Sequence, residues 1–291
     1  MNRIYFLLLS VLLILGCTIQ YYSDNDEIID NFSLNNNTLI NESSGNDNYV
    51  NITTYGDNGS AGNITISGNE YFGFVNWDFF DEWKADTVPP ECGDIILETP
   101  VNISLATSVL YPGQMRGGYY KAHGGLRFDY SNDNDIIVTA PFDGYVIRGS
   151  RYIESNEVQY LFDILNPCGI MYRFDHLRVL SEKFAEIAAG FPEAVEGDTR
   201  TSDAGNVFVE SGEVVAISVG LDDNVFFDFG VYDLRQRNEA SNDADWLAEH
   251  NGWSEPYALC WLELLSANDS ESLRLLPGAD YNSGTESDYC N

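Results

Sequence analysis

Three histidines, His123, His176 and His250, are the only imidazoles that this chain offers for metal binding or proton transfer near neutral pH. A site that requires more than one imidazole must be built from this short set. Among the carboxylates, Asp228 is unusual because it lies in the apolar run 225–232, where we expect a strand. An unpaired carboxylate on the core face of a strand is costly. We therefore expect Asp228 to be paired with a metal ion, an arginine or a histidine.

These residues belong to an ordered set of motifs. Three segments read HGGLRFD at 123–129, YRFDHL at 172–177 and FFDFGV at 226–231. Two glycine-containing segments lie between them, APFDGYV at 140–146 and ESGEVVAISVG at 210–220. The order of all five segments carries more information than any single motif.

In this order the five segments resemble the lysostaphin-like (LytM-type) zinc endopeptidases, a family of peptidoglycan hydrolases. The family pattern reads HGGIDF, AxxDGxV, YxHL, VxxGxxVxxxxxG and HxHFEV, and the resemblance covers residues 107–235. It implies a mainly β fold, a two-layer antiparallel β barrel-sandwich of the lysostaphin-like peptidase type. One short helix and an irregular C-terminal extension complete this expected fold.

The resemblance also assigns roles to individual residues. In the family, zinc is bound by the first histidine, by the aspartate four residues later and by the second histidine of HxH. Aligned without a gap, these three positions hold His123, Arg127 and Asp228. The catalytic histidine of YxHL aligns with His176, and Phe226 replaces the other catalytic histidine. Arg127 cannot bind zinc because it remains cationic, and Phe226 cannot transfer a proton.

Two arrangements of this site remain open. In the first, Arg127 fills the space of the ion and forms a two-pronged salt bridge with Asp228, with His123 and His176 close by and no zinc. In the second, a two-residue shift lets Asp129 replace the missing carboxylate, because side chains along a strand alternate with a period of two. The metal ligands are then His123, Asp129 and Asp228, and His176 is the catalytic base. Two carboxylates and one imidazole suit a harder divalent metal than zinc.

Each arrangement implies a function. The first predicts no cofactor and a non-catalytic binding or regulatory module of the cell envelope, with a cell-wall peptide or glycan as its partner. The second predicts a metal-dependent endopeptidase that acts on peptide cross-links of the cell wall, with zinc or another divalent metal. A third hypothesis, a surface structural glycoprotein, rests on the Asn-x-Ser/Thr triplets that recur within residues 18–69.

The charge of the chain excludes one class of partner. The sequence has 46 acidic and 14 basic residues, which gives a formal net charge of −32. A nucleic-acid-binding protein requires a basic surface, so we expect no nucleic-acid partner. The same repulsion opposes nonspecific binding to anionic lipid headgroups.

The N-terminal residues 1–17 have the features of a lipoprotein signal peptide. Arg3 supplies a positive charge, the stretch 4–15 is almost entirely apolar, and Gly16 precedes Cys17. The stretch is too short to span a membrane comfortably as a mature helix. We expect export from the cytoplasm and membrane anchoring through a lipidated Cys17. The alternative is an ordinary cleaved signal peptide that contains a cysteine.

Four further cysteines indicate disulfide bonds. An even number of cysteines in an exported chain is typical of two disulfides, and three connectivities are possible. We favour Cys260–Cys290, which closes the shortest loop of the candidate pairs that involve the C-terminus. This choice leaves Cys92 and Cys168 as the second pair.

The elements that must position the site follow from composition and periodicity. Residues 18–69 are rich in Asn, Ser, Gly and Asp, which predicts a disordered stalk, and residues 70–106 form an aromatic lead-in. Residues 107–235 form the β domain, and residues 236–291 form a C-terminal extension packed on it. The expected strands of the domain cover 136–140, 144–147, 158–165, 170–177, 207–209, 214–219 and 225–232. One helix is expected over 182–189 after an N-cap at Ser181, followed by a loop over 193–206.

Overall fold

The chain divides into two compact units, Met1–Phe72 and Gly73–Asn291, in the computed structural model. The structure describes residues 74–290 with their side chains, and five strands of the N-terminal unit by their backbone only. The expected signal peptide and the lipidation site Cys17 lie outside the described residues. Within the described part of the chain, no helix has the length and apolar character needed to cross a membrane.

The N-terminal unit contains a five-stranded antiparallel sheet in the order β1-β2-β3-β4-β5. Its strands are β1 (Ile19–Gln20), β2 (Asn31–Leu34), β3 (Thr38–Glu42), β4 (Tyr49–Tyr55) and β5 (Ala61–Ser67). These strands lie within the range expected to be a disordered stalk. Runs such as Asn-Ile-Thr-Thr-Tyr in β4 are rich in β-branched residues, which favour extended backbone. The stalk remains a prediction for the residues between the strands.

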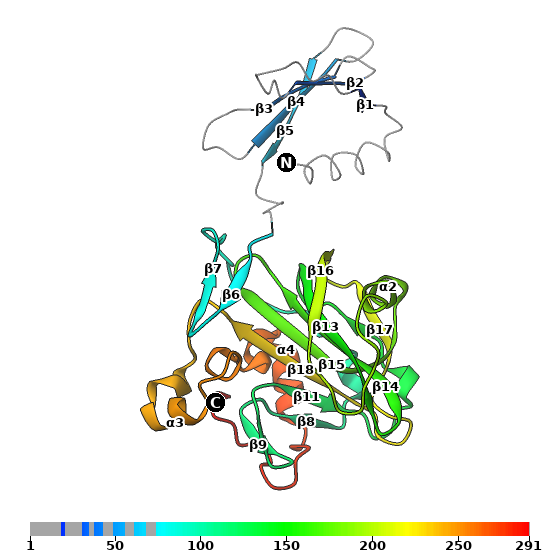
Figure 1. The fold of residues 1–291 in the computed structure, drawn as a ribbon, viewed down its shortest axis with the longest axis vertical. Coiled ribbons are helices and arrows are strands. Elements are labelled where there is room, and N and C mark those ends of the chain that lie inside the picture. The colour runs from blue at the N-terminus through cyan, green and yellow to red at the C-terminus, as the bar shows by residue number, and fades with distance from the viewer. Residues whose placement is uncertain are drawn as a thin grey trace. The chain divides into compact units, whose positions relative to one another are not determined.

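The second unit is mainly β, and its largest element is a nine-stranded antiparallel sheet (Figure 1). Its strands are β8 (Ser108–Leu110), β11 (Gly124–Arg127), β12 (Val138–Thr139), β13 (Gly144–Glu154), β14 (Glu157–Leu165), β15 (Ile170–Leu180), β16 (Ser202–Val209), β17 (Val214–Val219) and β18 (Phe226–Asp233). The strand order is β16-β13-β14-β15-β18-β11-β8, and β17 pairs with both β15 and β12. The mainly β, antiparallel character expected from the sequence is thereby confirmed.

Local sequence explains the central hairpin. Strands β13 and β14 carry many apolar residues, and their side chains include Val146, Phe162 and Ile164, all fully buried. The turn between them places Ser155 and Asn156 at φ values of 53° and 67°. Two consecutive residues with positive φ form the tight turn whose twist matches that of the flanking strands. This turn extends β13 well beyond the expected end at residue 147.

The expected loop over residues 193–206 is wrong at its C-terminal end. Strand β16 begins at Ser202, and the backbone of Asp203 pairs with Arg148 of β13. The segment 202–206 is polar and contains Gly205, so it has little intrinsic strand preference. The long neighbouring strand β13 supplies the pairing partner, and β16 forms the edge of the sheet.

Few helices accompany the sheet. They are α2 (Glu182–Ala188), α3 (Ala244–Glu249) and α4 (Ala267–Arg274), with short 3-10 turns η2 (Ile103–Leu105), η3 (Asp133–Asp135), η4 (Glu239–Asn242), η5 (Glu255–Tyr257) and η6 (Trp261–Leu264). Helix α2 lies where the sequence predicts it, and its buried Phe184 packs edge-on against Phe162. Ser181 occupies the expected N-cap position, although its side chain makes no capping hydrogen bond.

The flanking segments pack against the sheet. Hairpin β6 (Trp77–Phe79) and β7 (Trp83–Ala85) buries its two tryptophans in a small second core. Hairpin β9 (Gln114–Arg116) and β10 (Tyr119–Lys121) lies before the histidine at residue 123. In the extension, Trp261 is almost fully buried and packs against Phe229 of β18.

Two disulfides connect these segments, Cys92–Cys168 and Cys260–Cys290. This is the favoured pairing of the sequence analysis, and it is confirmed. The first joins the lead-in to the β14–β15 turn, and the second fixes the end of the extension beside η6. Disulfides of this kind are typical of proteins that fold outside the reducing cytoplasm.

Candidate functional site

Asp228 lies at the centre of the sheet, on a strand with neighbours on both sides. In the register of β18, Asp228 is opposite Gly125 of β11 and opposite Asp175 of β15. His123 immediately precedes β11, and His176 follows Asp175 on β15. The strand order therefore brings together three residues separated by more than fifty positions in the sequence, His123, His176 and Asp228. We call this trio the His–Asp–His cluster.

His123 is the close partner of Asp228. Its Nε2 lies 2.9 Å from Asp228 Oδ2, and the two side chains are 17% and 11% exposed. Two glycines provide the space for this pair. A Cβ atom on Gly125 would lie 2.9 Å from Asp228 Oδ1, and one on Gly230 would lie 2.9 Å from the Cβ of His123. The backbone of His123 is fixed as well, because Arg116 donates a 2.6 Å hydrogen bond to its carbonyl.

His176 is directed toward the cluster by a β-bulge. The register between β14 and β15 shifts here, since Tyr160 pairs with Leu177 but Phe162 pairs with Phe174. The extra residue on β15 allows His176 to adopt φ of 61°, a left-handed value that is uncommon outside glycine. The carboxylate of Asp175 accepts a 2.8 Å hydrogen bond from the His176 amide and stabilises this conformation. Such strain is often found at functional positions.

Hydrogen bonds determine which nitrogen of His176 carries the proton. Gln159 donates its amide Nε2 to the Gly220 carbonyl, so its Oε1 faces His176 Nδ1 at 2.7 Å. The Tyr152 hydroxyl donates to Asp175 and lies 3.2 Å from the same Nδ1. Because Gln159 Oε1 can only accept, Nδ1 is the donor. The Nε2 of a neutral His176 therefore presents a lone pair to the cluster, 3.9 Å from Asp228 Oδ2.

The charges around Asp228 favour its ionised form. Burial alone would raise the pKa of this carboxyl, but the hydrogen bond and charge of His123, together with His176 and Arg116, hold the pKa well below its usual range. Asp228 Oδ1 is buried without a hydrogen-bond partner among the described residues. The cluster thus contains a fixed negative charge and one unsatisfied acceptor, with His176 Nε2 3.9 Å from the carboxylate. Such an arrangement can accept a proton or bind a donor group.

The expected salt bridge between Arg127 and Asp228 is wrong. The Arg127 guanidinium donates to Asp129, with Nη2 3.0 Å from Oδ1. The register gives the reason, because Gly125 is directly opposite Asp228, whereas Arg127 is opposite Phe226 near the end of β11. Asp129 is two residues along the same chain and is the nearer carboxylate.

The alternative metal set of His123, Asp129 and Asp228 is not assembled either. Thr107 donates to Asp129 at 2.8 Å, and this bond and the Arg127 charge lower the pKa of Asp129. Within residues 74–290, no group of three metal-ligating side chains is close enough to hold an ion. The donor set expected from the resemblance therefore does not fit a zinc ion.

Phe226 covers the cluster on the side where the resemblance places a second catalytic histidine. Its ring centroid lies 4.4 Å from that of His176, with the rings tilted by 49°. An aromatic ring at this position restricts the movement of the imidazole and excludes water from one face. The contact provides no group for proton transfer.

Several residues of the site were not identified from the sequence, namely Arg116, Tyr152, Glu154, Gln159 and Asp175. Tyr152 and Gln159 are opposite each other in the β13–β14 hairpin. The signal for Gln159 is its position in the apolar strand 158–165, where a polar side chain requires a partner. Glu154 is 3.4 Å from His176 Nδ1. This contact depends on the bulge in β15, so the sequence gives no signal for it. Comparisons with models of protein families, with curated proteins and with solved structures each give no match for this chain.

Proposed function

We propose that this chain is a cell-envelope lipoprotein whose β domain acts as a binding or regulatory module and not as a peptidase. The domain is of the lysostaphin-like type, with the two-layer antiparallel barrel-sandwich of that family and a degenerate zinc site. Its partner is a peptide or glycan of the cell wall. Anchoring occurs through a lipid on Cys17, and the two disulfides support export.

One observation carries this proposal. Arg127 occupies a position that requires a metal ligand, and its charge is already neutralised by Asp129. A hydrolytic zinc site needs three protein ligands and an open position for water. Here the described residues retain one imidazole, His123, and one carboxylate, Asp228, and these two bond to each other. What remains is a polar cluster with unsatisfied hydrogen-bonding capacity, which suits recognition.

The test uses the full chain, purified in detergent, and insoluble peptidoglycan. We expect the protein to sediment with the polymer and to release no new amino groups, with or without a chelator. A His176→Ala variant should sediment less, because it removes one of the two imidazoles from the cluster. His250→Ala is the matched control, since His250 stacks on Trp246 in the extension and is not part of the cluster.

The same experiment examines the alternative function, a metal-dependent endopeptidase acting on cell-wall cross-links. The convergence of His123 and His176 on Asp228 favours this alternative. Release of amino groups that stops on adding a chelator, and that His123→Ala abolishes, would establish the peptidase and refute the binding module. Wild-type protein that neither sediments nor cleaves would refute both.

A further inference from the structure

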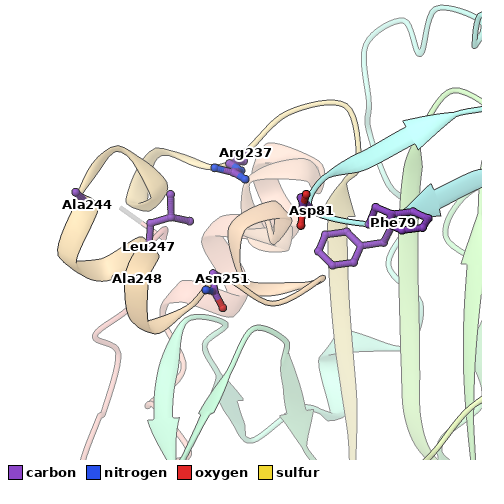
Figure 2. Close-up of a pocket in the computed structure, with 8 residues that line it drawn as sticks. Phe79, Asp81, Arg237, Ala244, Leu247, Ala248 and Asn251 are labelled. Atoms are coloured by element: carbon purple, nitrogen blue, oxygen red, sulfur yellow. The ribbon is translucent and has the colours of Figure 1, made fainter.

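A pocket of about 510 Å³ lies in a part of the second unit that is separate from the His–Asp–His cluster (Figure 2). The turn between β6 and β7 forms one wall with Phe79, Phe80 and Asp81, and helix α3 forms the other with Leu247. Arg237, in the segment after β18, lies at the rim. None of the three cluster residues lines this pocket, so the inference below is independent of the proposed function.

The pocket has the composition of a ligand site. Phe79, Leu247 and the alanines of α3 supply apolar surface, and Phe80 is 90% exposed to solvent. Together with Phe79 and Leu247, this exposed ring gives the hollow an apolar lining that a bound ligand would cover. Small-molecule sites are typically apolar hollows of several hundred Å³ with a few polar groups that fix orientation.

Arg237 is the exception among the arginines of residues 74–290. Each of the others donates to a carboxylate or a backbone carbonyl: Arg116, Arg127, Arg148, Arg151, Arg173, Arg178, Arg200, Arg235 and Arg274. Arg237 has neither an ion pair nor a hydrogen bond within this part of the chain, although the whole sequence has 46 acidic residues for 14 basic ones. A guanidinium that remains unpaired in such an acidic chain is available to an incoming anion.

Asp81 is the complementary group. It lies on the opposite wall from Leu247, and no ion pair connects it to Arg237 or to any other cation of residues 74–290. The pocket therefore presents one unpaired positive charge and one unpaired negative charge, together with apolar surface. A ligand that matches all three features carries a carboxylate, an ammonium group and an apolar side chain.

We propose that this pocket binds a short zwitterionic peptide with apolar side chains. Its free carboxylate forms a two-pronged bond with Arg237, its α-ammonium pairs with Asp81, and its side chains pack on Phe79, Phe80 and Leu247. The pocket volume accommodates a peptide of about two residues. Blocking either terminus removes one of the two charge contacts.

The experiment is calorimetric titration of the full chain with leucyl-leucine in four forms: free, N-acetylated, C-amidated and doubly blocked. We expect the free dipeptide to bind most tightly. Each block should weaken binding about tenfold, the effect of losing one charge-assisted hydrogen bond, and the doubly blocked form should not bind measurably. Equal affinity for all four forms, or no binding of the free form, would overturn the proposal.

Two variants assign each terminus to its residue. Arg237→Gln should weaken binding of the free dipeptide about tenfold and leave the affinity for the C-amidated form unchanged. Asp81→Asn should show the converse pattern with the N-acetylated form. Arg200→Gln is the matched control, because Arg200 is an exposed arginine paired with Asp198 outside the pocket. An Arg237→Gln variant that loses affinity for all forms alike, or for none, would contradict the assignment.

Discussion

Two buried carboxylates of the same sheet, Asp163 on β14 and Asp228 on β18, have opposite environments. Asp163 is fully buried and accepts bonds from two arginines, at 2.5 Å from Arg148 Nε and 2.6 Å from Arg173 Nε. Both guanidinium groups also lie over the ring of Trp253. Asp228 has instead the imidazoles of His123 and His176, and one of its oxygens has no partner among the described residues.

The comparison distinguishes a structural ion network from a site that is able to react. Arginines stay cationic at any physiological pH, so the charge on Asp163 is always compensated. A histidine is charged only when it is protonated, so His123 and His176 are not permanent counter-charges of Asp228 as the arginines are of Asp163. The unpaired carboxylate oxygen and the strained His176 also belong to the site around Asp228. Recognition chemistry is therefore expected at Asp228 and stability at Asp163.

The largest expected effect is at Asp163. Asp163→Asn removes the charge that compensates Arg148 and Arg173 and leaves two partly buried cations without a counter-charge. We expect the free energy of unfolding to fall by about 3–5 kcal/mol. Urea unfolding of the full chain measures this change, with Asp198→Asn as the exposed control. If the free energy of unfolding falls no more than in the control, Asp163 does not have the structural role proposed for it.

A smaller effect is expected at Asp228. In Asp228→Asn, the amide oxygen still accepts a hydrogen bond from His123, so the loss should be about 1 kcal/mol at neutral pH. The same variant should impair sedimentation with peptidoglycan. If it unfolds as easily as Asp163→Asn and binds normally, Asp228 is a structural residue and the distinction fails.

The pH dependence of stability sharpens the comparison. The pKa of Asp228 is lower in the folded state than in the unfolded state, so the folded state binds fewer protons. The stability contributed by this carboxylate is then present above about pH 4 and is lost as the pH falls below that value. We expect the unfolding free energies of wild type and Asp228→Asn to converge as the pH is lowered from 5 toward 2. A constant difference over this range would show that the charge of Asp228 contributes nothing.

The smallest effect concerns the bulge at His176. Tyr152→Phe removes the hydroxyl that donates to Asp175, and burial and Asp175 raise the pKa of that hydroxyl, so it stays protonated. We expect a loss of about 0.5–1 kcal/mol and a shifted His176 resonance in NMR spectra. Tyr160→Phe, in the same hairpin, is the control. An unchanged His176 resonance would show that the Tyr152 hydroxyl does not help to hold the bulge at His176.

Much of the fold was predictable because the strands of the β domain carry strong local signals. The helix after Ser181, the apolar runs of β14 and β18 and the disulfide pairing all follow from periodicity, stop signals and loop length. The start of β16 and the full length of β13 could not be predicted in this way, because each strand is stabilised by pairing with the other. Such tertiary pairing has no local signature.

The candidate site was predictable in its members and not in its contacts. The order of the motifs identified His123, His176 and Asp228, and the structure brings them together. The predicted partner of Arg127, Asp228, was wrong. The choice between Asp129 and Asp228 depends on strand register, which the motifs do not determine. Tyr152 and Gln159 contact His176 only because β15 contains a bulge.

The two disulfides also determine how the second unit responds to mechanical force. Tension applied to its ends passes from Cys92 directly to Cys168 and from Cys260 directly to Cys290. The residues enclosed by each bridge, 93–167 and 261–289, are bypassed and cannot lengthen while the bonds remain intact. Strands β11, β13 and β14 belong to the first bypassed segment, whereas β15 to β18 lie on the path of the tension. Stretching in oxidising conditions should therefore extend the chain around His176 and Asp228 while the segment that carries His123 stays covalently closed.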